Sequence, residues 1–223
     1  MKKDIKPDYV NVSEALRYLG YGSNEPEQNM KELLSLCEKE LINSARPAYV
    51  FNIFNLNEEC KLKGCSFELE GNEIKKHLSG CEKAILMCVT LSADVDRLIR
   101  MKQVGNMAQA TIIDSMASAY VEQVCDEVES IIREELPGYK FTWRFGIGYG
   151  DFPLKGQKQF LNVLDASKKI GVCVNDNYML TPTKSVTCII GAGKDINEEK
   201  KSCGNCDFRD RCQLRKRGAS CGR

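Results

Sequence analysis

Residues 106–136 read NMAQATIIDSMASAYVEQVCDEVESIIREEL, the longest stretch of the chain without glycine or proline. The stretch ends at Pro137-Gly138, a pair that stops a helix. Apolar residues recur in it every three or four positions, which places them on one side of a helix. These residues are Met107, Ala110, Ile113, Ala117, Val121, Val124 and Val128. The pattern therefore predicts one long helix that packs against the core.

Shorter elements are predicted on both sides of this helix. Runs rich in β-branched, aromatic and other apolar residues predict strands at 48–54, 84–90, 140–145, 172–174 and 185–190, and a weaker alternation suggests another at 66–70. Helical spacing and capping residues predict helices at 13–20, 26–41, 72–78 and 153–168. Because strands and helices follow one another without regular alternation or internal repeat, an α+β fold is favoured over a doubly wound α/β fold.

The overall composition is that of a globular protein. Of the 223 residues, 43% are hydrophobic and 28% are charged, which allows a core of normal size. The net charge of +1 creates no field that would attract nucleic acid or an anionic membrane. The sequence contains neither a signal-like apolar run near Met1 nor ~18 consecutive apolar residues. We therefore expect a cytoplasmic protein with no membrane span, and a nucleic-acid partner is disfavoured.

A strand-like segment runs into RFGIGYGDFP, residues 144–153. Its alternate glycines lack the β-carbons that would keep a ligand away from the backbone. Arg144 offers a forked set of donors for a carboxylate, and Tyr149 offers a flat apolar face with a hydroxyl at its edge. The combination suits a ligand with a carboxylate, an adenine and a ribose. A tight turn with a surface arginine is the simpler interpretation of the same residues, and the glycines do not have dinucleotide-binding spacing.

The order Arg-x-x-x-Gly-Tyr followed by proline resembles the signature of the activation domain of cobalamin-dependent methionine synthase. Other motifs, in the same order along the chain, are similar to that family over residues 70–192. They are Leu78-x-Gly80-Cys81, Asp114-Ser115-Met116-Ala117-Ser118, Lys168-Lys169-Ile170-Gly171-Val172 and Tyr178-Met179-Leu180-x-Pro182-x-Lys184-Ser185-Val186. The resemblance implies the fold of that domain: α+β, with a mixed, mostly antiparallel sheet and several helices, including one long central helix.

The resemblance also implies a ligand and a set of roles. In the family, inactive cob(II)alamin is reduced by one electron and methylated by S-adenosylmethionine, which the activation domain presents. Carried over to this chain, Arg144 would bind the carboxylate of S-adenosylmethionine, and Gly146 and Gly148 would allow backbone contact. Tyr149 would line the site. No catalytic residue is expected, because the methyl group has only to be aligned with cobalt.

The cobalamin itself is expected on another chain. The only histidine, His77, lies in a His-x-x-Gly sequence, but Lys75 occupies the position of the acid that would orient a cobalt-bound imidazole. A surface or helix-end histidine is therefore favoured over a cobalt ligand. We expect a corrinoid-binding methyltransferase subunit as partner, with an electron donor such as a flavodoxin or ferredoxin. The homocysteine- and folate-binding barrels do not fit into 223 residues, so the chain is not a complete synthase.

Composition changes after Gly193, so residues 1–193 are predicted to form the activation-like domain and residues 194–223 a basic, cysteine-rich tail. The tail holds four of the twelve cysteines: Cys203, Cys206, Cys212 and Cys221. A C-x2-C step lets two thiolates reach one tetrahedral metal, and nearby cations favour thiolates. Zinc and an iron–sulfur cluster both suit such a site, and a tail without metal is the alternative. The other eight cysteines are expected mostly to pack as small hydrophobic residues.

Two further functions are compatible with these features. An iron–sulfur protein would use the tail to deliver electrons to a corrinoid protein. A zinc-stabilised interaction module would bind zinc but not S-adenosylmethionine. Ligand titration and metal analysis would separate these functions from the leading one.

Overall fold

The computed structural model describes residues 5–21 and 25–198. The predicted metal ligands Cys203, Cys206, Cys212 and Cys221 lie outside the described residues. The zinc and iron–sulfur predictions therefore stay predictions.

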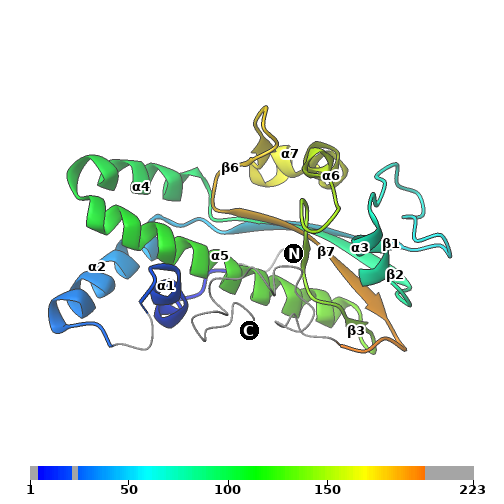
Figure 1. Ribbon diagram of the computed structural model, residues 1–223, viewed down its shortest axis with the longest axis horizontal. Helices are drawn as coiled ribbons and strands as arrows, with labels where there is room; N and C mark the ends of the chain where they lie inside the picture. The colour runs from blue at the N-terminus through cyan, green and yellow to red at the C-terminus, as the bar shows by residue number, and fades with distance from the viewer. Residues whose placement is uncertain (1–4, 22–24, 199–223) are drawn as a thin grey trace.

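Three long antiparallel strands form the centre of the molecule (Figure 1). They are β1 (Ala48–Asn55), β2 (Lys83–Thr90) and β7 (Ser185–Gly193), in the order β1-β2-β7. All residues of β2 after Lys83 are buried, which is the expected environment for a nearly continuous apolar strand. The outer edge of β7 pairs with two short strands, β3 (Lys140–Phe141) and β4 (Phe145–Gly146).

Helices cover both faces of this sheet. One face carries α1 (Val12–Tyr18), α2 (Gln28–Ser44), α4 (Ala93–Gly105) and the long α5 (Met107–Glu135). The other carries α3 (Asn72–His77), α6 (Gln157–Leu164) and α7 (Ala166–Ile170), with a 3₁₀ turn, η1 (Leu154–Gly156), before α6. Figure 1 shows α6 and α7 on the opposite side of the sheet from α1 and α5. A small hairpin of β5 (Cys173–Val174) and β6 (Leu180–Thr181) leads back to β7.

The sheet separates two hydrophobic cores, because successive side chains of a strand point to opposite faces. Ile85, Met87 and Val89 of β2 join the core beneath α1, α2, α4 and α5. Ala84, Leu86 and Cys88 join the core beneath α3, α6 and α7. The chain passes from one core to the other between β3 and β4, since Phe141 belongs to the first core and Phe145 to the second.

The long helix α5 forms as its sequence predicts. Asn106 caps its start, where its side chain accepts a hydrogen bond from the backbone of Gln109, and the helix ends before Pro137-Gly138. Each of the seven predicted stripe residues except Met107 is buried. Tyr120, fully buried, donates a hydrogen bond from its hydroxyl to the carbonyl of Pro7 at 2.6 Å, which fastens the N-terminal segment to α5. No helix in the described part of the chain is both long and apolar enough to span a membrane.

Several elements differ from the predictions. The helix α4 was not predicted, because Met101 and Val104 in its last turns are exposed and break its apolar pattern. Residues 66–70 form no strand, although Phe67 and Leu69 are buried. The predicted helix at 153–168 is divided at Asp165, which adopts a left-handed conformation.

The predicted strand at 140–145 is divided too. Its middle residue Thr142 accepts a hydrogen bond on its hydroxyl from the backbone of Gly191 at 2.8 Å and lies 2.8 Å from the ring of His77. Because of this break between β3 and β4, Arg144 makes no strand pairing with β7, and its side chain lies on the side of the sheet that faces α5.

Candidate functional site

The glycine turn follows directly after β4. Phe145 pairs with Ile189 and Gly146 with Cys188, and the backbone of Tyr149 then donates to the carbonyl of Gly146 at 3.2 Å. Gly148 has a φ of +87°, which an L side chain rarely adopts, and a β-carbon there would lie 2.9 Å from Leu154. The turn therefore depends on glycine at position 148 for its own shape.

Gly146 is different. Its φ is not positive, and the only neighbour that a β-carbon would approach is the carbonyl oxygen of Thr187, at 4.0 Å. The fold itself therefore has room for a side chain at this position. The absence of one leaves open space above the edge of β7, where another molecule could contact the backbone.

Arg144 reaches across to three carboxylates of α5. Nη2 lies 2.9 Å from Glu122, Nη1 lies 2.9 Å from Asp126, and Nη1 also donates to Glu129. The arginine side chain is 17% exposed. Although burial alone would lower its pKa, the acidic groups of α5 raise it above its usual range, so it is a fixed cation.

The three acids follow one another at spacings of four and three residues, so they lie on one face of α5. Burial raises the pKa of Glu129, and the Arg144 guanidinium opposes this rise. The charge of Arg133 also favours the ionised form of Glu129 and lowers its pKa.

A groove with a volume of about 430 Å³ lies next to this cluster. It is lined by residues of α1, α5 and the segment that enters β7: Tyr18, Asp114, Ser115, Ser118, Val121, Glu122, Thr183, Lys184 and Ser185. Lys184, 12% exposed, donates to Asp114 and to the hydroxyl of Ser118, both at 2.9 Å. Glu122 belongs both to the wall of the groove and to the Arg144 cluster, so the groove borders this ion cluster.

An aromatic cluster supports the turn from the other face of the sheet. The ring of Tyr149 meets Phe145 edge-on at 5.4 Å and Trp143 at 5.7 Å. The ring of His77, the last residue of α3, lies 4.4 Å from Trp143. Burial lowers the pKa of His77 to about 4, so the imidazole is neutral at pH 7. The prediction of a helix-end histidine is thus confirmed, and this histidine is half-buried against the turn.

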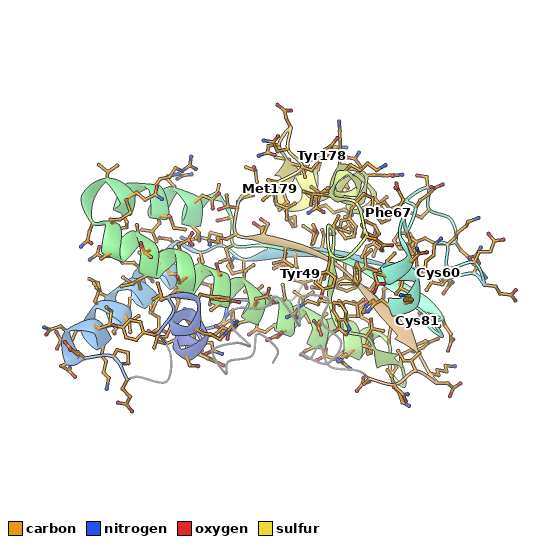
Figure 2. The ribbon with its side chains drawn as sticks, in the orientation of Figure 1. Tyr49, Cys60, Phe67, Cys81, Tyr178 and Met179 are labelled. Atoms are coloured by element: carbon orange, nitrogen blue, oxygen red, sulfur yellow. The ribbon has the colours of Figure 1, made fainter. Side chains whose placement is uncertain are left out.

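The motifs that resemble the activation-domain family are far apart in the sequence, and three of them meet at this site. The groove takes Asp114, Ser115 and Ser118 from one motif and Lys184 and Ser185 from another. Glu122 then connects the groove to the motif that begins at Arg144. Tyr178 and Met179, from the start of the motif that supplies Lys184 and Ser185, are exposed at the tip of the β5–β6 hairpin (Figure 2).

Sequence reasoning did not single out Glu122, Asp126 and Glu129. An acidic face on a long helix is usually a solvated face, and the three acids look the same in the sequence. The apolar stripe predicts which side of α5 packs against the core, and this is the only indication in the sequence of where the three acids lie. The position of Arg144 opposite the acids depends on tertiary structure.

The described cysteines supply no metal site. Cys37, Cys88, Cys125 and Cys188 are buried, and none of the eight described cysteines forms a disulfide. Burial raises the pKa of the Cys88 thiol to about 12, which keeps it protonated. Within residues 5–21 and 25–198, no three His, Cys, Asp or Glu side chains are grouped as metal ligands. The packing prediction is confirmed for the four buried cysteines.

Comparison with known proteins adds a relationship at the level of the fold. No protein-family model and no curated protein matches the sequence. The observed architecture belongs to the α+β class that the sequence predicts. A solved structure described as "Crystal Structure of the MetH Reactivation Domain bound to AdoHcy" matches with a TM-score of 0.58 and 13% sequence identity, covering 95% of this chain and 85% of that chain. The predicted fold, with its antiparallel sheet and long helix, is confirmed.

Proposed function

We propose that this protein binds S-adenosylmethionine in the groove and the adjoining glycine turn, and that it supports the reductive methylation of a cobalamin held by another chain. The observation that carries the proposal is the proximity of three separate motifs: two of them line the groove, and Glu122 in its wall bonds to Arg144 of the third. The structurally similar reactivation domain was solved with AdoHcy, which is S-adenosylmethionine without its methyl group. A site of this volume is in the range of pockets that hold small molecules.

The residues of the turn have distinct roles in this proposal. Gly146 offers backbone contact above the sheet edge, and Gly148 gives the turn its shape. Tyr149, which packs edge-on against Phe145 on the face of the sheet opposite α5, would meet the ligand at the turn and not in the groove. Arg144 binds the carboxylate of the ligand through its N–H groups on Nε and Nη2 that make no bond to any described residue.

The reaction needs alignment more than acid–base chemistry. A methyl group on a sulfonium transfers to a nucleophilic metal without a protein proton donor, so the contribution of this chain is to hold the donor in one orientation. The corrinoid comes from a methyltransferase subunit, and the electron comes from a donor such as a flavodoxin or ferredoxin. A metal bound by Cys203, Cys206, Cys212 and Cys221, which lie outside the described residues, would suit the electron-transfer role.

The proposal is tested by calorimetric titration of the full chain with S-adenosylmethionine, using Gly146→Val as the decisive variant. Valine is well accepted in a strand, and a β-carbon here would lie 4.0 Å from its nearest neighbour, so we expect the variant to fold, which circular dichroism checks. The side chain would fill the open space over β7, so we expect affinity to fall at least about ten-fold.

Arg97→Ala is the control, because Arg97 is exposed and its ion pair, with Asp94 at 3.3 Å, lies away from the groove residues. Absence of saturable binding to the unmodified protein would refute the proposed function. Unchanged affinity in a folded Gly146→Val protein would refute the placement of the ligand at the turn.

A further inference from the structure

The segment that leads into β7 forms one rim of the groove. Thr183, Lys184 and Ser185 all line the groove, and we call residues 183–185 the rim segment. The carbonyl of Lys184 accepts a hydrogen bond from the backbone of Leu91 at 2.9 Å, which ties this residue to the end of β2. Thr183 lies two residues before the start of β7, so its position depends on contacts from outside the sheet.

Asp96, in the first turn of α4, supplies such a contact. Its Oδ2 accepts a hydrogen bond from the backbone of Thr183 at 2.9 Å, and its Oδ1 accepts one from the Thr183 hydroxyl at 2.5 Å. Hydrogen bonds to a carboxylate are stronger than those between neutral groups. Because one carboxylate takes both donors of the same residue, it fixes the orientation of Thr183 as well as its distance from α4. Asp96 itself does not line the groove.

The next residue of the rim segment is attached to a different helix. The Nζ atom of Lys184 donates to Asp114 and to the hydroxyl of Ser118, both on α5 and both at 2.9 Å. The rim segment is therefore held on two sides, with Thr183 bound to α4 and Lys184 bound to α5. Loss of the attachment to α4 would let the start of the segment move relative to the wall that α5 provides.

We propose that Asp96 is a positioning residue for the groove: it holds the rim segment, through Thr183, in the arrangement that binds the ligand. The inference rests on the proposed function and adds a residue that acts on the groove from outside it. Without the carboxylate, the rim segment would be distributed over several arrangements, and the apparent affinity would fall with the share of molecules in the binding arrangement. A share of about one-fifth would weaken binding about five-fold.

The test is calorimetric titration of the full chain with S-adenosylmethionine, comparing two substitutions of Asp96. Asp96→Ala removes both acceptors, so we expect the affinity to fall about five-fold. Asp96→Asn removes the charge, but its amide can still accept from the backbone of Thr183 and donate to the hydroxyl. We expect this variant to bind within about two-fold of the unmodified protein. A role of Asp96 through its charge at the start of α4 would instead give equal losses in the two variants.

Asp94→Ala is the matched control. Asp94 lies in the same first turn of α4, forms an ion pair with Arg97 at 3.3 Å and does not line the groove. A second measurement follows the attachment without any ligand: hydrogen exchange of the Thr183 amide. Exchange should become about ten-fold faster in Asp96→Ala and stay nearly unchanged in Asp96→Asn and Asp94→Ala, because only the first variant removes the acceptor of that amide.

Three results would count against the positioning role of Asp96. Unchanged affinity in a folded Asp96→Ala protein would overturn it while leaving the proposed function intact. Equal losses of affinity in Asp96→Ala and Asp96→Asn, or an unchanged exchange rate of the Thr183 amide in Asp96→Ala, would overturn it as well. Failure of S-adenosylmethionine to bind the unmodified protein would refute the proposed function and the inference with it.

Discussion

Replacing Arg144 with methionine should destabilise the protein by about 2–3 kcal/mol. The change keeps a long apolar side chain but removes the guanidinium that Glu122, Asp126 and Glu129 share. Breaking a buried ion pair by removing one partner costs about 3–5 kcal/mol, and an exposed pair contributes about 0.2–1 kcal/mol. This cluster lies between the two cases, because Arg144 is 17% and Glu129 22% exposed while Asp126 is 51% exposed.

The loss should depend on pH in a defined direction. Burial raises the pKa of Glu129 even with Arg144 beside it, and removal of the guanidinium would raise it further. A carboxyl whose pKa is higher in the folded than in the unfolded protein binds its proton more tightly when folded. Stability then increases as the pH falls through the folded-state pKa. The destabilisation by Arg144→Met should therefore be largest at about pH 7.5 and smaller at about pH 5.

Urea denaturation followed by far-UV circular dichroism measures this effect. A loss of 2–3 kcal/mol would move the midpoint by roughly 1 M urea. Arg97→Met, in an exposed ion pair with Asp94, should cost less than about 0.5 kcal/mol and serves as the control. The reasoning would be refuted if the two variants lost equal stability, or if the loss in Arg144→Met were the same at both pH values.

Two other predictions concern the support of the turn. His77 should remain neutral in NMR titration until the pH approaches about 4. The stability of the fold should decrease as the pH drops from about 6.5 toward that value, because the histidine of the unfolded protein binds its proton first. His77→Asn should remove this pH dependence, and an imidazole that titrates near 6.5 in the folded protein would contradict the prediction. Gly148→Ala should cost about 1–2 kcal/mol, since φ is +87° and the new β-carbon would press on Leu154, whereas no loss in thermal unfolding experiments would show that the turn does not need its glycine.

The elements whose apolar residues follow a regular pattern could be predicted from the sequence. The stripe of α5 and the apolar run of β2 each point to one structure, because burial of a helix side or of a whole strand leaves a regular pattern. The helix α4 could not be found in the same way, since Met101 and Val104 are exposed near its end. Its packing against α5 depends on neighbours that are absent from its local sequence.

The site could be predicted only in part. The turn that holds Gly146 and Tyr149 is a local motif, so its residues could be named before the structure. The groove is a tertiary feature, because Ser118 and Lys184 come together only when β7 lies beside α5. The break between β3 and β4, which turns Arg144 toward the helix, depends on the hydrogen bond from Gly191 to Thr142 and has no marker in the local sequence.

The position of Arg144 at the point where the chain crosses between the two cores has a mechanical consequence. The Arg144 side chain, at the edge of the sheet, bonds to three residues spread over about two turns of α5, from Glu122 to Glu129. A slide of the helix by one residue, about 1.5 Å along its axis with a rotation, would misalign all three bonds at once. The arginine therefore helps to fix the position of α5 along the sheet, and with it the distance between Ser118 and Lys184. Substitutions at Asp126 or Glu129, which do not line the groove, would alter its width through this attachment.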